Sequence, residues 1–317
     1  MKIPSTRIVF LSLCVVAAGC GKKSFDLPPT GVQVVQSEQM NTKVDVVLMV
    51  DNSSSMLRHQ TKLVEELPAL INSLNAQGMD WRIGVTTSDF NGSGGRLEGN
   101  AGDEFISAAT PDGMNKLMNR AMPGENGSDL ERGIETVKSS LGSIVRDLRS
   151  DAMLSIIFLS DDNDYSATTS AQFTAYVDSI KPRFRSGLRS WVAHYIGTVR
   201  LTQECTASLG KWNGVGQKYI DIVNATGGAV ESICVAGFSQ ALGNVRVRMG
   251  ELMTEVPLAR VPKVETIVVT INGQAVPQST TDGWEYIPGK NVIKFHGNQI
   301  PKPNDVVNIN FDPASAT

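Results

Sequence analysis

Residues 44–55 read VDVVLMVDNSSS, and this stretch decides the fold. The first seven residues are nearly all apolar, which is typical of a short strand buried on both faces of a sheet. Apolar residues then recur every three or four positions from Leu57 to Leu74, which predicts an amphipathic helix. A buried strand that passes through a polar loop into a helix is the opening unit of an alternating α/β fold.

The same alternation continues as far as about residue 255. We expect further strands at 81–87, 153–159, 190–196 and 229–233, and helices at 111–121, 128–141, 170–181, 215–226 and 238–253. Strands that alternate with helices are joined by right-handed crossovers. Residues 43–255 are therefore predicted to form a Rossmann-like α/β domain, with a mostly parallel sheet flanked by helices.

The character of the sequence changes at about residue 256. Prolines become frequent and helical periodicity ends, while strand-like runs occur at 266–271, 284–287, 292–295 and 306–311. Asn272-Gly273 follows the first of these runs and is a strong hairpin signal. Residues 256–317 are predicted to be a small antiparallel β module, in which we identify no chemistry.

The amino-terminal segment has the pattern of an export signal. Lys2 and Arg7 precede a short apolar run, and residues 17–20 read AAGC. These four residues resemble a lipobox, which implies cleavage after residue 19 and acylation of Cys20 with chains such as palmitate; the alternative is an ordinary secreted protein. Gly21 stands where an aspartate would signal retention in the inner membrane, so the resemblance favours the outer membrane. Residues 21–42 are polar and are predicted to be a tether.

The remaining cysteines agree with export. Cys14 leaves with the signal and Cys20 takes the lipid, so only Cys205 and Cys234 remain in an oxidising compartment. We predict that they form a disulfide; the alternative is two free buried thiols.

Composition narrows the classes of partner. The chain has 317 residues, a formal net charge of −3 and no basic stripe, which argues against a nucleic-acid-binding protein. After residue 20 no apolar run approaches the length needed to span a bilayer. The body of the protein is therefore predicted to meet the membrane through its lipid anchor alone.

Three oxygen-rich clusters follow or adjoin the predicted strands. Asp51, Ser53 and Ser55 follow the first strand. The strand at 153–159 runs into Ser160 and Asp161, and Ser128 opens the predicted helix at 128–141. Ligands of open parallel sheets gather at the carboxyl ends of the strands. Carboxylates and hydroxyls suit Mg²⁺, Mn²⁺ or Ca²⁺ better than zinc or copper.

The Asp51-x-Ser53-x-Ser55 pattern after a buried strand resembles the metal-ion-dependent adhesion site of von Willebrand factor type A domains. Ser128 falls where that family usually has threonine, and Asp161 falls where it has its second aspartate. The resemblance covers residues 43–255. It implies that Ser53, Ser55 and Ser128 contact the metal directly, whereas Asp51 and Asp161 act mostly through waters.

The function that follows is a membrane-anchored, Mg²⁺-dependent adhesion module, with Mn²⁺ or Ca²⁺ as alternatives. Its partner would be a protein whose exposed Asp or Glu enters an open metal position, with no small-molecule substrate. A metal-independent envelope scaffold is the first alternative. A hydrolase is the second, but a haloacid dehalogenase-like site would need an aspartate where Ser53 stands, and no GxSxG, Walker or HExxH motif occurs. We therefore expect no enzymatic activity.

Overall fold

The computed structural model of this chain describes residues 33–39, 42–183, 189–203, 205, 214–302 and 305–314. The predicted signal segment, Cys20 and the start of the predicted tether lie outside these residues. Within the described part of the chain, no helix combines the length and the apolar character that crossing a membrane requires.

The α/β domain is built on a six-stranded sheet that is parallel except at one edge. Asp45 to Val50 of the central strand pair with neighbours on both sides, and the added edge strand runs antiparallel. In spatial order the strands are β4 (Phe105–Ser107), β3 (Asp80–Thr87), β2 (Lys43–Val50), β5 (Met153–Ser160), β6 (Trp191–Gly197) and β7 (Val230–Ser232). The predicted Rossmann-like fold class is thus confirmed.

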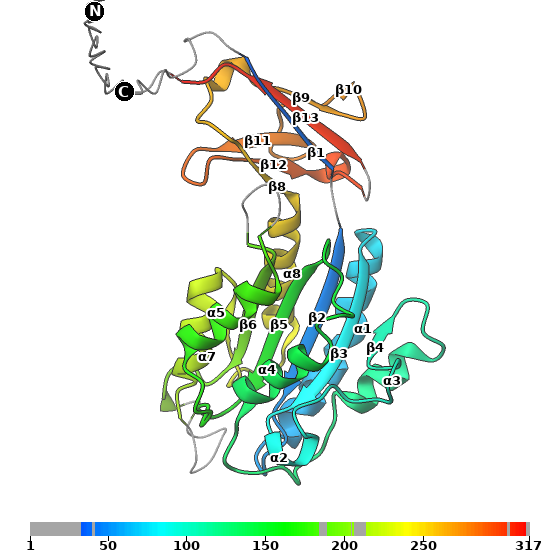
Figure 1. Cartoon of the computed structure of the whole chain (residues 1–317), viewed down its shortest axis with the longest axis vertical. Coiled ribbons are helices and arrows are strands. Elements are labelled where there is room, and N and C mark those ends of the chain that lie inside the picture. The colour runs from blue at the N-terminus through cyan, green and yellow to red at the C-terminus, as the bar shows by residue number, and fades with distance from the viewer. Residues whose placement is uncertain are drawn as a thin grey trace, which may run out of the picture.

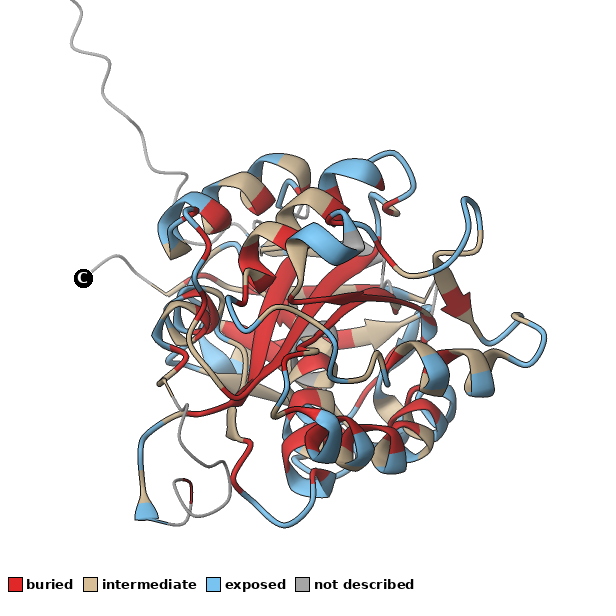
Figure 2. Ribbon diagram, turned by 90° about the horizontal axis from the view of Figure 1, so that it is seen from below, coloured by how far each residue is buried: buried red, intermediate tan, exposed pale blue. Residues whose placement is uncertain are grey.

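Helices cover both faces of this sheet, which explains why its strands are apolar on both faces. One hydrophobic cluster joins the sheet to α1 (Leu57–Ala76), α3 (Gly113–Arg120) and α8 (Ser239–Thr254). A second cluster joins the other face to α4 (Gly133–Ser143), α5 (Ser170–Ile180) and α7 (Gln217–Thr226). Figure 2 shows the buried strands between the two layers of helices.

The antiparallel module consists of two small sheets around a core of its own. The spatial orders are β1-β13-β9-β10 and β11-β12-β8, and Trp284, Phe295 and Phe311 lie in the shared core. The bounds are β1 (Val34–Gln39), β8 (Glu255–Pro257), β9 (Val268–Ile271), β10 (Gln274–Ala275), β11 (Gly283–Ile287), β12 (Val292–His296) and β13 (Val306–Phe311). Short 3-10 helices lie at Val264–Thr266 and Gly297–Gln299.

Strand β1 was not predicted. The predicted tether extended to residue 42, whereas the structure pairs Val34 with Phe311 and continues this antiparallel ladder along β1. The module is therefore completed by chain that precedes the α/β domain, and the α/β domain is inserted between two of its strands. Helix α8 leads into β8 without an intervening loop.

The module lies at the end of the α/β domain where the parallel strands begin (Figure 1). The carboxyl ends of the strands lie at the opposite end, next to the short helix α2 (Phe90–Ser93), which follows β3. The loops that carry the predicted metal ligands are thus at the far end of the molecule from the β module.

Candidate metal centre

Asp51 lies at the carboxyl end of β2 and is 0% exposed. Its backbone amide donates to Leu159 O at 2.9 Å, which keeps the residue in line with the sheet. One carboxylate oxygen accepts hydrogen bonds from Ser53 N at 2.8 Å and from Ser88 Oγ at 2.9 Å. The strand end and its first turn therefore hold this carboxylate in a fixed orientation.

Asp161 follows β5, the neighbouring strand, and is 1% exposed. Thr198 Oγ1 donates to its backbone carbonyl at 2.7 Å, but no hydrogen bond of ordinary geometry reaches either carboxylate oxygen within the described residues. Burial and the charge of Asp51 raise the pKa of Asp161 to about 7, although Ser55 and Arg58 partly offset this increase. The carboxylate is therefore buried without the partners that normally stabilise its charge.

Glu131 is the third acid of the cluster and is 2% exposed. Burial raises the pKa of Glu131 to about 11, and the adjacent charge of Asp51 adds to the effect. Ser160 Oγ lies 2.8 Å from Glu131 Oε2 and 2.7 Å from Asp51 Oδ2. A hydroxyl has one proton, so protonated Glu131 can donate to Ser160 while Ser160 donates to Asp51.

The three acids fit a hard cation. Asp51, Glu131 and Asp161 each offer a carboxylate oxygen, and these oxygens all lie within 4.8 Å of one another. Ser53 Oγ is also buried without a hydrogen-bond partner among the described residues. Because Mg²⁺, Mn²⁺ and Ca²⁺ take oxygen ligands at about 2.0–2.6 Å, one ion would reach several of these atoms at once.

The predicted serine ligands are placed differently from one another. Ser53 is buried beside Asp51, and Ser55 is partly buried and close enough to Asp161 to lower its pKa. Ser128 is partly exposed, and its Oγ accepts a hydrogen bond from Leu130 N at 3.1 Å. In the described part of the chain no hydrogen bond joins Ser128 to Asp51 or Asp161, and its role as a ligand stays a prediction.

Sequence reasoning missed Glu131 because it placed this residue inside a helix at 128–141. Helix α4 begins at Gly133 instead, where an added Cβ would lie 2.6 Å from Tyr219 Oη and 2.7 Å from Met49 Cε. A side chain at this position would have to displace the Tyr219 ring or the Met49 methyl group, so glycine favours this close approach of α4 to β2. The residues before it form a loop that turns Glu131 inward. The signal in the sequence is an acid two residues before this glycine.

Two buried histidines, His59 and His194, are held in the neutral form. Burial lowers the pKa of both His59 and His194 to about 3, and nearby cations add to the effect. Both imidazoles are therefore neutral at physiological pH. His194 Nδ1 accepts the amide of Ala229 at 3.1 Å, as a structural core residue does.

Cys205 and Cys234 form a disulfide, as predicted, with their Cα atoms 4.9 Å apart. The bond joins the segment after β6 to the segment before α8. Both half-cystines are buried, so the bond belongs to the core at the carboxyl end of the sheet.

No family model matches this chain, and no curated protein matches it. Among solved structures, it is similar to the pilus adhesin SpaC from Lactobacillus rhamnosus GG in an open conformation, with a TM-score of 0.45 and 12% identity over 88% of this chain and 40% of that one. It is also similar to proximal thread matrix protein 1 from the mussel byssus. One crystal form of that protein gives a TM-score of 0.42 and 10% identity over 70% of this chain and 51% of that one. The chain thus spans about half or less of these proteins.

Proposed function

We propose that this protein is a divalent-cation-dependent protein-binding module of the von Willebrand factor type A kind. It is exported and anchored to the cell envelope, in the outer membrane, through a lipid on Cys20. Its activity is binding, with no bond-breaking step, and an acidic side chain of the partner supplies the last ligand of the cation.

The acid cluster at the carboxyl ends of β2 and β5 carries this proposal. Asp51 and Asp161 are buried, and no Lys, Arg or His of the described residues forms an ion pair with either of them or with Glu131. Burying a carboxylate without a partner is costly, so such clusters are typical of cation sites.

Mg²⁺, Mn²⁺ or Ca²⁺ would be held by Asp51, Asp161, Ser53 and Ser55, with Ser128 as a further candidate. The bound cation supplies a positive centre with an open position for an oxygen ligand. The Asp51 carboxylate is oriented by Ser53 N and Ser88 Oγ before any cation arrives. Pre-oriented ligands reduce the entropy lost when the cation and then the partner bind.

The position of the cluster suits an anchored adhesion module. Strand β1 begins at Val34 in the β module, and the acid cluster lies at the opposite end of the molecule (Figure 1). A lipid upstream of β1 would therefore hold the cation site away from the membrane, where a protein partner can reach it.

Thermal unfolding of residues 21–317 tests the cation site. The midpoint temperature of unfolding should be lowest in EDTA, and millimolar Mg²⁺, Mn²⁺ or Ca²⁺ should raise it. A cation present at 100 times its Kd adds about 2.7 kcal/mol to the free energy of unfolding. Asp161→Ala should remove this shift without weakening the metal-free fold, since the Asp161 carboxylate accepts no ordinary hydrogen bond.

If no cation shifts the unfolding of the wild-type protein, the proposal fails and the metal-independent envelope scaffold replaces it. A shift that survives in Asp161→Ala would place cation binding elsewhere on the molecule. Pull-down of partners with and without EDTA then separates cation-dependent binding from scaffold assembly.

A further inference from the structure

The loop between Gly127 and Gly133 carries three oxygen side chains. Asp129 is exposed and accepts a hydrogen bond from Ser54 Oγ at 3.1 Å, which leaves Ser128 and Glu131 as candidate ligands. Glu131 is almost completely buried, and its carboxylate lies with those of Asp51 and Asp161. Ser128 is partly exposed, and its hydroxyl is engaged by Leu130 N within its own loop. The residue implied by family resemblance is thus the less well placed of the two.

We infer that Glu131 is a direct ligand of the cation, so that the centre has three carboxylates. This inference rests on the proposed function, because it assumes that a cation binds at the cluster. Oxygens of all three acids lie within 4.8 Å of one another, which one ion with ligand distances of about 2.0–2.6 Å can span. Ser53 Oγ and both oxygens of Asp161 are buried at the same place without hydrogen bonds from the described residues.

Glu131 is held in place from several sides. Its carbonyl accepts the amide of Tyr165 at 2.8 Å, and the next amide, of Arg132, donates to Ser88 O at 2.9 Å. Ser160 Oγ contacts its carboxylate at 2.8 Å. These contacts come from the loops after β3 and β5 as well as from β5 itself, so the carboxylate has its position before a cation binds.

A third carboxylate changes the cation that the site prefers. Mg²⁺ usually takes one or two carboxylates and keeps several waters, whereas Ca²⁺ takes six to eight oxygens and accepts more carboxylates. Three ionised carboxylates around a divalent cation leave a net charge of −1. Glu131 therefore favours Ca²⁺ over Mg²⁺ and weakens the pull of the loaded site on an acidic partner.

Calorimetric titration of residues 21–317 with Ca²⁺ and with Mg²⁺ tests the inference. Glu131→Gln keeps the size of the side chain and a contact with Ser160 but removes the negative ligand. Loss of a residue that only orients a metal ligand typically lowers metal affinity by about 10- to 100-fold. We expect the Ca²⁺ affinity of Glu131→Gln to fall by at least this factor. Its preference for Ca²⁺ over Mg²⁺ should fall as well.

Three further variants complete the test. Ser128→Ala should keep the wild-type Ca²⁺ affinity, and so should the matched control Glu125→Gln, an exposed acid of the preceding loop. Glu131→Asp keeps the charge but withdraws the oxygen by one methylene, and should weaken Ca²⁺ even if Glu131→Gln fails to fold.

Wild-type affinity in Glu131→Gln together with a loss in Ser128→Ala would overturn the inference and leave the proposed function standing. Absence of Ca²⁺ and Mg²⁺ binding in the wild-type protein would instead overturn the proposed function.

Discussion

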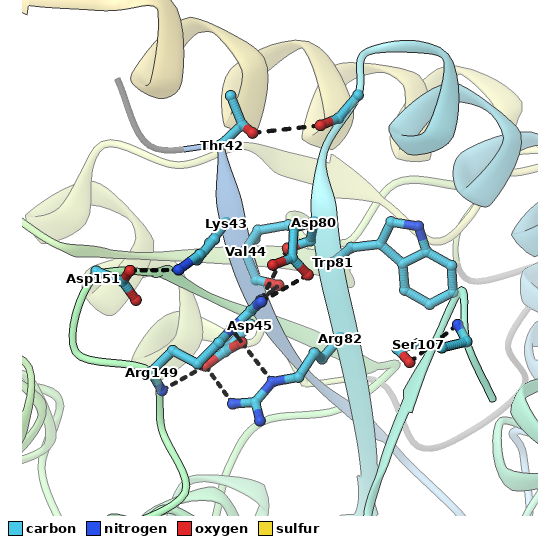
Figure 3. A network of polar contacts seen from close by, with 12 residues as sticks. Thr42, Lys43, Val44, Asp45, Asp80, Trp81, Arg82, Ser107, Arg149 and Asp151 are labelled. Carbon is cyan, nitrogen blue, oxygen red and sulfur yellow. Dashed lines mark hydrogen bonds and ion pairs between the residues drawn. The ribbon is translucent and has the colours of Figure 1, made fainter. Parts of the chain in front are cut away.

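Strand β2 carries a buried aspartate near each of its ends, and the two have opposite surroundings. Near the amino end, Asp45 is 1% exposed and lies between Arg82 and Arg149 (Figure 3). Arg82 donates to it at 2.9 and 2.7 Å, and Arg149 donates from its side chain at 2.8 Å and from its backbone at 3.0 Å. One oxygen of this carboxylate thus accepts from two guanidinium groups, and the other accepts from one guanidinium group and one backbone amide.

At the carboxyl end, Asp51 has two more buried acids beside it, and no cation among the described residues pairs with any of the three. The two buried carboxylates are stabilised in different ways. Asp45 is surrounded by arginines, whereas Asp51 is surrounded by serine hydroxyls and by neighbouring acids that retain their protons. The first arrangement is complete without a ligand. In the proposed function, a bound cation stabilises the second arrangement as an ionised cluster.

The largest effect on the fold is expected at the amino end. Asp45→Ala leaves Arg82 without an acidic partner and Arg149 with only the exposed Asp80, which should lower the free energy of unfolding by about 3–5 kcal/mol. Urea denaturation with and without Ca²⁺ should show the same loss, because this network does not take part in cation binding. A loss that Ca²⁺ reverses would break the distinction between the two ends.

The disulfide should come next. Among the described residues the carboxyl end has no arginine network like that of Asp45. The bond between Cys205 and Cys234 closes a loop with a sequence separation of 29 residues. Replacing both cysteines with serine should lower the free energy of unfolding by about 3 to 4 kcal/mol in the chain-entropy model. Comparison of thermal unfolding before and after reduction of the wild-type protein provides the check. Equal midpoint temperatures for the oxidised and the reduced protein would show that the disulfide does not stabilise the carboxyl end of the sheet.

The pH dependence of the free energy of unfolding should distinguish the two ends of β2 without any substitution, because it arises from the acids at the carboxyl end. The pKa of Asp161 is raised to about 7 and that of Glu131 to about 11, so the folded protein binds these protons more tightly than the unfolded chain. The stabilisation of the fold by these two protons is fully present below about pH 4 and is lost as the pH rises through the pKa values of the folded protein. Each proton contributes about 1.4 kcal/mol per pH unit, so in EDTA the free energy of unfolding should fall by about 2 kcal/mol per pH unit between pH 5 and 7.

Saturating Ca²⁺ should reverse this trend, because cation binding improves as the acids lose their protons. Thermal unfolding at pH 5, 6 and 7 measures both trends. Asp161→Ala and Glu131→Gln should each show a shallower slope in EDTA. Equal slopes in the variants and the wild type would assign the pH dependence to other groups.

The smallest effect is expected at the exposed pair between Lys43 and Asp151, which lies next to the Asp45 network (Figure 3). Their side chains are 40% and 53% exposed, so water and salt screen the pair. Lys43→Ala should change the free energy of unfolding by less than about 1 kcal/mol. A larger loss in urea denaturation would show that this pair belongs to the buried network.

The α/β architecture was predictable because its signals are local. Residues 44–50 and 153–159 are apolar on both faces, and the helices around them have clear periodicity, so the observed strands and helices match closely. Strand β1 carries no such signal: it reads VVQSEQ, and its partner β13 lies more than 260 residues later in the chain. Pairing over that distance cannot be read from either segment alone.

The acid cluster was predictable in part for the same reason. Asp51 and Asp161 directly follow buried parallel strands, which places them at one edge of the sheet. The position of Glu131 depends on where α4 begins, and α4 begins at Gly133, which packs closely against Met49 and Tyr219. Helical periodicity extends upstream of this contact, so the pattern alone assigned Glu131 to the helix.

Binding of Mn²⁺, followed by electron paramagnetic resonance of the free ion, tests the cation site most directly. Wild-type protein should remove one equivalent of Mn²⁺ from solution, Asp45→Asn should do the same, and Asp161→Ala should leave the Mn²⁺ free. Undiminished binding by Asp161→Ala, or no binding by the wild type, would contradict a cation site at the carboxyl ends of β2 and β5.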